Sequence, residues 1–305
     1  MDFHELEAFA ALANHLHFAR AAAAVNTSPS ALSRIIGRLE QEMGAALVAR
    51  DTRSVALTEA GSLFLSFALE SLRGKDALHL RLGSVDGRLR GTLRVYASVT
   101  ACYSILPPLA AVLKATHPDL RLSVETGDPA DGPRILKEGR VELALAALNP
   151  LTMGGLEGFS VEKTPLVFVT ARDGEFGAWG EGPIRAQTLR GAPLILPSRG
   201  LARERFDDWA RSQDLRPLIA AETSGNEAVL ALARLGLGLG LVPRLVLENS
   251  PFAQGLVQYN AGADLGDYDI GFLLPAARTG GQAALAETLR ELLERAYPAG
   301  RWSRG

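Results

Sequence analysis

Polar and basic side chains gather at the start of one short helix expected near the N-terminus. Ser28 is a natural N-cap, and Pro29 follows at the first helical position, where its missing N–H costs nothing. Ser30, Ser33 and Arg34 then lie on the face opposite the apolar side chains of this helix. A guanidinium can donate two hydrogen bonds to guanine, and serine hydroxyls suit phosphates or base edges. The spacing predicts a helix whose N-terminal residues contact DNA.

Three further arginines are expected near the DNA backbone: Arg38 on the same helix, and Arg50 and Arg53 around the polar tip that follows it. Residues 20–58 contain five arginines and three acidic residues, but residues 1–90 contain ten basic and ten acidic residues. The placement of the arginines, and not bulk charge, must therefore account for DNA binding. From the residues alone, the alternative is a helical protein-interaction module with solvated arginines.

A second group of polar residues lies where strands are expected to end. Ser98 and Thr100 follow a strand and precede a helix, so their hydroxyls and the free N–H groups there could bind an anion. Ser198 follows another strand, and Ser224 precedes the helix that begins near Asn226. Open parallel sheets bind ligands beyond the carboxyl ends of their strands, so these loops should face one cleft. Ordinary helix capping is the alternative role for these hydroxyls.

Nearby arginines could bind a ligand carboxylate. Arg199, Arg203 and Arg205 are the candidates, but Arg203 and Arg205 are two residues apart on a helix and cannot both face the ligand. A solvated face is the alternative for at least one of them. Asp128 and Asp131 are expected to be turn and cap residues, because a carboxylate would repel an anionic ligand.

Several other chemistries are not supported. The five histidines have no Cys or carboxylate partners at metal-ligand spacing, so we expect no metal site. The glycines at 236, 238 and 240 lead into a strand instead of opening a helix, which disfavours a dinucleotide loop. The sequence has no Walker A lysine, no nucleophile elbow and no paired carboxylates arranged for catalysis. We expect neither an enzyme nor a bound cofactor.

Cys102 is the single cysteine of the chain, so an intramolecular disulfide cannot form. It is expected just inside the helix after Thr100, where the helix dipole could lower its pKa. A redox sensor is the alternative to a structural role, but no second cysteine is available to resolve an oxidised thiol.

Composition indicates a globular protein with two or three domains. The chain has 305 residues, with 47% hydrophobic and 22% charged residues and a net charge of −2. The N-terminus has no basic, apolar pattern typical of a signal peptide, and the longest uncharged stretch, residues 95–113, contains two prolines and several hydroxyls. We expect a cytoplasmic protein with no membrane partner.

The first region, residues 1–58, is expected to fold as an all-α winged helix-turn-helix. Apolar side chains at helical spacing predict helices from Phe3 to Ala13, from Phe18 to Val25, and from Pro29 to Met43. Two short strands, 47–49 and 55–57, then form a wing.

Residues 59–90 are expected to form one long linker helix. Its leucines are spaced by three and four residues, and it is too long to be buried by a small domain. We predict a dimer seam; the alternative is a single surface helix that packs on its own chain.

Strands and helices alternate in residues 91–305, which predicts an α/β fold with parallel strands. Two lobes fit this order better than one continuous sheet. We expect the first lobe to comprise roughly residues 91–165 and 269–305, and the second lobe residues 166–268.

Several segments resemble the LysR-type transcriptional regulators. The segments that carry the resemblance are Phe18-Ala19-Arg20-Ala21-Ala22, the run from Ser28 to Glu40, Leu47-Val48-x-Arg50 and Leu57-Thr58-Glu59-Ala60-Gly61. Val48 replaces the phenylalanine usual in this family. The match extends over the whole architecture, and it implies a C-terminal effector domain like the two-lobed periplasmic binding proteins.

Further segments resemble the IlvY branch of this family. They are Ser98 to Pro108, Thr126-Gly127-Asp128-x-Ala130-Asp131, Asn226-Glu227-Ala228-Val229, and Pro243-x-x-Val246-Leu247-Glu248-Asn249-Ser250-Pro251. The branch activates the gene for acetohydroxy acid isomeroreductase, an enzyme of isoleucine and valine synthesis. Its inducers are 2-acetolactate and 2-aceto-2-hydroxybutyrate.

The resemblance implies a double-stranded DNA operator, RNA polymerase, a second copy of the chain and a small organic acid as partners. The family commonly forms homodimers that pair into homotetramers. Two other interpretations stay open: a LysR-type regulator of another organic acid, and a cytoplasmic solute-binding protein with an N-terminal interaction module.

The predicted DNA-binding residues are Ser28, Pro29, Ser30, Ser33, Arg34, Arg38, Arg50 and Arg53. The predicted effector-binding residues are Ser98, Val99, Thr100, Thr126, Ser198, Arg199, Arg203, Ser224 and Asn226.

Overall fold

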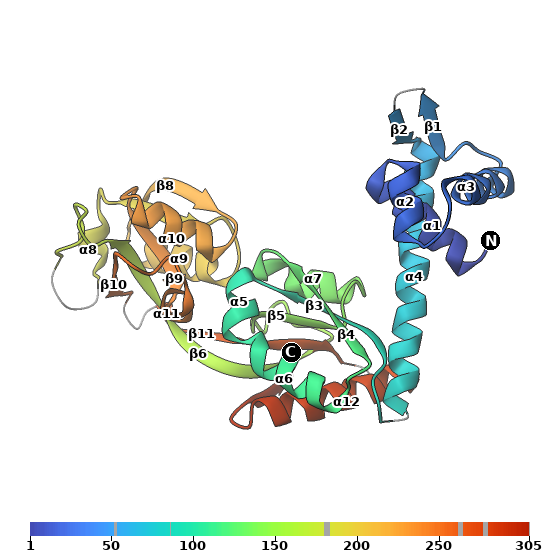
Figure 1. Cartoon of the computed structure of the whole chain (residues 1–305). Helices are drawn as coiled ribbons and strands as arrows, with labels where there is room; N and C mark the ends of the chain where they lie inside the picture. Colours follow the sequence, from blue (N-terminus) through green and yellow to red (C-terminus); the bar gives the residue numbers. More distant parts are fainter. Residues whose placement is uncertain (52–53, 86, 180–183, 262–264, 277–279, 305) are drawn as a thin grey trace. The chain divides into compact units, whose positions relative to one another are not determined.

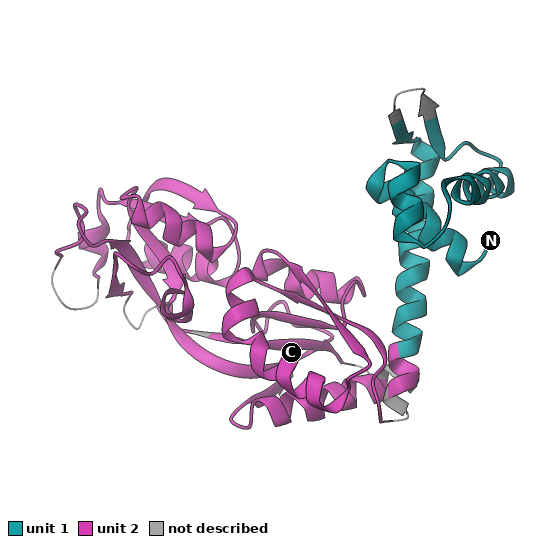
Figure 2. Cartoon of the chain, viewed as in Figure 1, with its two compact units in different colours: residues 1–79 teal, residues 80–305 magenta. Residues whose placement is uncertain are grey.

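The chain forms two compact units, residues 1–79 (unit 1) and 80–305 (unit 2) (Figure 2). The computed structural model describes residues 1–51, 54–85, 87–179, 184–261, 265–276 and 280–304. None of the helices in these ranges is long and apolar enough to cross a membrane.

Unit 1 is a helical unit with a small hairpin. Its elements are α1 (Phe3–His15), α2 (Phe18–Ala24), α3 (Pro29–Met43), β1 (Val48–Asp51), β2 (Ser54–Leu57) and the first part of α4 (Glu59–Val85). Side chains define the helix ends: Asp2 and Glu5 form a capping box at α1, and the Ser28 hydroxyl caps α3. Gly44 ends α3 in the left-handed conformation, with φ of 67°. The expected order of helix, helix, turn, helix and hairpin is therefore present.

The core of unit 1 lies between α1, α3 and the start of α4. Leu32, Ile36 and Leu39 lie on one side of α3 and are fully buried. Phe9 of α1 contacts Phe64 of α4 edge to face, with ring centroids 4.9 Å apart. This packing leaves the opposite side of α3 exposed.

Helix α4 is long, as predicted, but it ends at Val85 and not at residue 90. Gly87 adopts a left-handed φ of 71°, and the Arg88 N–H donates to the Gly83 carbonyl, which closes the end of the helix. Several large apolar side chains of α4 are exposed in the single chain: Leu63, Phe67, Leu69, Leu78 and Leu82.

Unit 2 has two lobes built on connected sheets (Figure 1). The strands of the first lobe are β3 (Gly91–Ala97), β4 (Leu120–Thr126), β5 (Leu143–Ala147), the first part of β6 (Leu156–Ala171), β11 (Asp267–Pro275) and β12 (Arg301–Arg304). Its helices are α5 (Val99–Ser104), α6 (Leu106–Thr116), the 3-10 turn η1 (Pro129–Asp131), α7 (Gly132–Lys137) and α12 (Gly280–Ala296).

The second lobe contains the remaining elements. Its strands are the last part of β6, β7 (Pro193–Pro197), β8 (Leu218–Thr223), β9 (Leu239–Pro243) and β10 (Leu256–Asn260). Its helices are α8 (Ala186–Leu189), α9 (Leu201–Ser212), α10 (Asn226–Arg234) and α11 (Arg244–Asn249). Helices cover both faces of each sheet: α6 and α12 lie opposite α7 in the first lobe, and α9 lies opposite α10 in the second.

Strand β6 connects the lobes. Its first part pairs with β11 and β12, and its last part, from Leu166, pairs with β9 and β10. The chain returns from β10 of the second lobe to β11 of the first. The sequence predicted only the apolar end of β6, because its first part contains charged residues such as Glu162 and Lys163, which are exposed. These residues pair with β11 without being buried.

Candidate functional site

The exposed side of α3 presents most of the residues predicted to contact DNA. Ser28, Ser30 and Arg34 are exposed, and Ser33 is half-buried. The Ser28 hydroxyl accepts a hydrogen bond from the Ala31 N–H at 3.2 Å, so its first role is to cap the helix. Pro29 is exposed at the first position of the helix.

The outer arginines have different surroundings. Arg38 is two-thirds exposed, and its Nη2 forms an ion pair with Glu5 Oε1 at 2.8 Å. Arg50 belongs to β1, and Arg53 lies outside the described residues. Gln41 is exposed two turns after Arg34 on the same helix. It was not among the predicted residues, although spacings of three and four residues place it on the same exposed face, and a glutamine side chain there has the groups that bind adenine.

In unit 2, two adjoining cavities lie between the lobes, with volumes of about 170 and 30 Å3. The larger is lined by Asp128, Pro129, Ala130, Pro133, Ala147, Asn149, Thr152, Pro197, Arg199, Gly200, Leu201, Ala202, Glu204, Gly225 and Asn226. The smaller is lined by Ser98, Thr100, Ala101, Ser104, Ile105, Pro129, Leu145, Ala146, Ala147, Asn226, Pro243, Leu245, Val246 and Ile270. We call this pair of cavities the cleft. Its loops follow the carboxyl ends of strands from both lobes, where open α/β sheets bind ligands.

Four of the nine predicted effector-binding residues line the cleft: Ser98, Thr100, Arg199 and Asn226. The other five do not line it: Val99, Thr126, Ser198, Arg203 and Ser224. Arg203 instead forms ion pairs within its own lobe, with Asp207 of α9 and Glu222 of β8. Arg205 binds the main-chain carbonyls of Leu265 and Asp267.

The hydroxyls expected to bind an anion already have partners. The Ser98 hydroxyl caps α5 by accepting from the Ala101 N–H at 3.2 Å. The Thr100 hydroxyl donates to Glu227 Oε1, which belongs to α10 of the opposite lobe. A carboxylate from the protein therefore lies beside the place where the sequence predicted a ligand anion.

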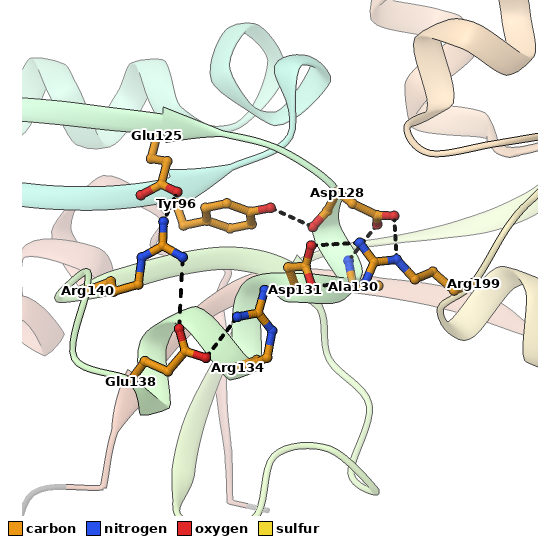
Figure 3. A network of polar contacts seen from close by, with 9 residues as sticks. All are labelled: Tyr96, Glu125, Asp128, Ala130, Asp131, Arg134, Glu138, Arg140 and Arg199. Atoms are coloured by element: carbon orange, nitrogen blue, oxygen red, sulfur yellow. Dashed lines mark hydrogen bonds and ion pairs between the residues drawn. The ribbon is translucent and has the colours of Figure 1, made fainter. Parts of the chain in front are cut away.

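Arg199 also contacts the opposite lobe. Its guanidinium forms ion pairs with Asp128 at 3.1 Å and with Asp131 at 2.7 Å (Figure 3). Asp128 does cap η1, because its Oδ1 accepts from the Ala130 N–H at 2.9 Å. The hydrogen bonds from Arg199 hold the pKa of Asp131 below its usual value. The two aspartates are thus more than turn residues: they bind the one basic side chain among the described residues that line the cleft.

The environment of Cys102 differs from the prediction. Burial raises the pKa of the thiol, and the nearby Glu227 carboxylate raises it further. The direction of this shift in pKa is opposite to the lowering expected at the start of α5. This environment disfavours a reactive thiolate.

Some polar residues of the cleft were missed. Asn149 follows β5 and donates through Nδ2 to Glu204 Oε2 of the other lobe at 3.4 Å. Its position just after a predicted parallel strand was an available signal. The Glu204 and Glu227 carboxylates had no such signal: only the folded chain shows that Glu204 lines the larger cavity and that Glu227 accepts a hydrogen bond from Thr100. Within the described ranges, no group of three or more His, Cys, Asp or Glu side chains could hold a metal ion.

Comparisons with known proteins agree with this architecture. Residues 3–62 match the bacterial regulatory helix-turn-helix protein, lysR family, and residues 86–297 match the LysR substrate binding domain. The HTH-type transcriptional regulator IlvY of Escherichia coli (strain K12) is 36% identical over 252 residues, which are 82% of this chain and 84% of that protein. The HTH-type transcriptional activator IlvY of Haemophilus influenzae is 31% identical over 274 residues, 89% of this chain and 93% of that protein.

The fold matches that of solved full-length relatives. The crystal structure of full-length CbnR complexed with its target DNA is one of them. Its alignment with this protein includes 96% of this chain and 100% of the CbnR chain, with a TM-score of 0.71 and 23% identity. Both the helix-turn-helix unit and the two-lobed unit thus have counterparts in one architecture. The chain therefore belongs to the LysR family, and it is a DNA-binding transcriptional regulator and not an enzyme.

Proposed function

We propose that this regulator activates genes of branched-chain amino acid synthesis in response to a small acetohydroxy acid, 2-acetolactate or 2-aceto-2-hydroxybutyrate. The similarity to regulators named IlvY supports this assignment, because it extends over four-fifths or more of the chain. The main observation behind the proposal is that the side chains lining the cleft match the functional groups of such an acid.

An acetohydroxy acid has one carboxylate, one hydroxyl, one ketone and a short alkyl group. Arg199 supplies a cation for the carboxylate, and the amides of Asn149 and Asn226 can bind the hydroxyl and the ketone. Pro129 and Ala147, which line both cavities, offer an apolar wall for the alkyl group. A cavity of about 170 Å3 also suits a small acid better than a drug-sized ligand, which typically needs about 300–1,000 Å3.

In the mechanism we propose, the acid bridges the two lobes and changes how they close on each other. The ligand can shift this equilibrium only by binding one arrangement more tightly than the other. The shift is transmitted through α4 to helix-turn-helix units bound at a dyad-symmetric operator, where it favours RNA polymerase.

For DNA binding we propose the roles predicted from the sequence. Arg34 contacts a guanine, Ser30 and Ser33 contact phosphates or base edges, and Arg38, Arg50 and Arg53 contact the backbone. The exposed apolar side chains of α4 support a dimer seam, with Leu63 and Phe67 in unit 1 and Leu82 in unit 2. A tetramer would then form from two such dimers.

The test is isothermal titration calorimetry of the full-length chain with 2-acetolactate, with benzoate and muconate as other acids. We expect saturable binding of acetolactate that Asn226→Ala weakens about tenfold or more. Arg203→Ala is the matched control, because its guanidinium pairs within one lobe and does not line the cleft.

Binding of benzoate or muconate alone would make the protein a LysR-type regulator of another organic acid. No binding of any acid to the folded chain would overturn the assignment of the cleft to this effector class. Neither result would change the family of the protein.

A further inference from the structure

We propose that Arg199, Asp128 and Asp131 form a latch across the cleft, in which two carboxylates of the protein occupy the guanidinium that an effector needs. The aspartates take three of the five N–H donors of Arg199, so an effector carboxylate can form a bidentate contact with this guanidinium only by displacing one of them. The latch is therefore a built-in competitor for the ligand. This competition rests on the proposed function, but the presence of the latch does not.

The geometry of the latch is that of a tightly held guanidinium (Figure 3). Nε of Arg199 donates to Asp128 Oδ2 at 3.1 Å, and Nη1 and Nη2 donate to the two oxygens of Asp131 at 3.0 and 2.7 Å. All three nitrogens thus have a carboxylate partner, and the contact to Asp131 is bidentate. Arg199 precedes α9 of the second lobe, whereas both aspartates belong to the first. The contacts therefore join the lobes directly.

The main chains also approach closely at this point. Gly200 has a left-handed φ of 88°, and a Cβ placed on it would lie 3.1 Å from the Cβ of Ala130 in the opposite lobe. Ala130 lies between the two aspartates. An added methyl group at Gly200 would therefore require its neighbour in the opposite lobe to shift by a few tenths of an ångström.

Both aspartates also have contacts within the first lobe that do not involve Arg199. Asp128 is fixed from both sides: its Oδ1 accepts from the Ala130 N–H, and its main-chain carbonyl accepts from the Tyr96 hydroxyl at 2.9 Å. Asp131 has a second cation, Arg134, whose Nη2 lies 3.1 Å from Oδ1. When Arg199 leaves, Asp131 keeps a charged partner, which lowers the cost of opening the latch.

The latch also reverses the local charge expected for an anion site. Arg199 is the one basic side chain among the described residues that line the cleft, and Asp128 and Glu204 line the same cavity. Asp131 lies next to it. An acid entering the cleft meets net negative charge, and the cation that can pair with its carboxylate is the guanidinium that the aspartates hold. Effector binding and the closed latch are therefore competing uses of the Arg199 guanidinium.

The first experiment needs no ligand and tests the latch itself. Amide hydrogen exchange of the full-length chain is compared between wild type, the isosteric double variant Asp128→Asn/Asp131→Asn, and Arg199→Met. We expect exchange about threefold faster or more in both the 127–132 and 198–203 segments of each variant, because the lobes separate more often. Arg203→Met is the matched control and is compared in the 127–132 segment, because Arg203 itself lies in the 198–203 segment and binds the Pro197 carbonyl. It removes an ion-paired arginine from the same helix region without crossing the cleft, so exchange of the 127–132 segment should not change.

Unchanged exchange in both segments, in a double variant with the same circular dichroism as wild type, would overturn the latch. Faster exchange confined to the mutated segment would overturn it as well, because a latch must protect both lobes. Arg199→Lys provides a second measurement if the methionine variant fails to fold, since lysine keeps the charge but loses the bidentate contact.

The second experiment tests competition, with 2-acetolactate as the probe in calorimetry of the full-length variants. The double asparagine variant should bind the acid about three- to tenfold more tightly, because the guanidinium is freed from two charged partners. Arg199→Met should bind it more than about tenfold more weakly. Weaker or equal binding by the double variant would show that the carboxylates do not compete with the ligand.

The two proposals fail in different ways. If wild type binds no acid, the proposed effector class fails, and hydrogen exchange still decides whether the latch is present. If acetolactate binds and the exchange is unchanged, the effector class stands and the latch fails.

Discussion

The exposed side of α3 in unit 1 and the cleft of unit 2 are built over very different distances along the chain. On α3, the exposed residues Ser30 and Arg34 lie one helical turn apart, so helix geometry alone brings them together. In the cleft, Arg199 meets Asp131 across 68 residues, and Thr100 meets Glu227 across 127 residues. A substitution on the surface of α3 should therefore change a contact without changing the fold, whereas a substitution in the cleft changes how the lobes meet.

The largest effect is expected from Ile36→Ala, which tests whether the two units are independent. Ile36 is fully buried in the core of unit 1. Its truncation should lower the free energy of unfolding of unit 1 by about 2–5 kcal/mol. The three tryptophans, Trp179, Trp209 and Trp302, all belong to unit 2, so their fluorescence follows unit 2 alone. In urea, circular dichroism should show an earlier transition while the tryptophan midpoint stays unchanged.

Ser30→Ala is the control for this variant, because it alters the exposed side of the same helix and should change stability by less than about 0.5 kcal/mol. Equal shifts of the tryptophan and circular dichroism transitions in Ile36→Ala would show that the units unfold together. That result would contradict the view that the exposed side of α3 and the cleft belong to units that fold independently.

The same difference in distance explains what the sequence could predict. The third helix was predicted with its N-cap at Ser28 and its end near Gly44, because caps and apolar spacing are local signals. The alternation of the longer strands and helices in unit 2 was predicted for the same reason, but the short elements α5, α8, α11, β10 and β12 were not. The end of α4 was missed because Gly87, whose left-handed φ stops the helix, looks like any other glycine in the sequence.

The sequence predicted where the cleft lies but not which side chains pair with each other across it. Strand ends indicated Ser98, Thr100, Arg199 and Asn226, which do line it. No local pattern indicates that Glu227 accepts a hydrogen bond from Thr100 or that the two aspartates bind Arg199. Those pairs depend on the long strand β6 and on the return through β11, which bring the two lobes together. The interpretation of the aspartates as turn and cap residues was therefore incomplete for Asp128, which caps η1 and also binds Arg199, and the cap role was wrong for Asp131, whose side chain makes no capping hydrogen bond at α7.

Arg34→Ala should have the next largest effect, and only on DNA. Arg34 is exposed, and its loss should leave the stability of unit 1 unchanged. If it contacts a guanine, binding to the operator should weaken by about 1–3 kcal/mol. Fluorescence anisotropy with a labelled promoter fragment at fixed salt measures this loss. Arg216→Ala, which removes an exposed arginine from unit 2, is the control and should bind as wild type does.

The smallest effect is expected from Tyr96→Phe, which should change the stability of unit 2, where the cleft lies, and leave unit 1 unaffected. The variant keeps the buried ring but loses the hydroxyl that donates to the Asp128 carbonyl at 2.9 Å. Unit 2 should lose about 0.5–1.5 kcal/mol of its free energy of unfolding at neutral pH. Operator binding without effector should not change. Urea unfolding followed by tryptophan fluorescence measures the difference.

The pH dependence of the difference in unfolding free energy between wild type and Tyr96→Phe distinguishes loss of the hydroxyl from a general change in packing. Burial raises the pKa of Tyr96 to about 12 from an ordinary value of 10. The folded state therefore favours the neutral phenol, so its contribution is complete below pH 10 and is lost as the pH rises from 10 towards 12. Tyr297, whose pKa burial also raises to about 12, is present in both proteins and cancels in the comparison. The stability gap between wild type and Tyr96→Phe should thus narrow above pH 10, and a gap that stays constant to pH 11 would assign the loss to packing instead of to the buried hydroxyl.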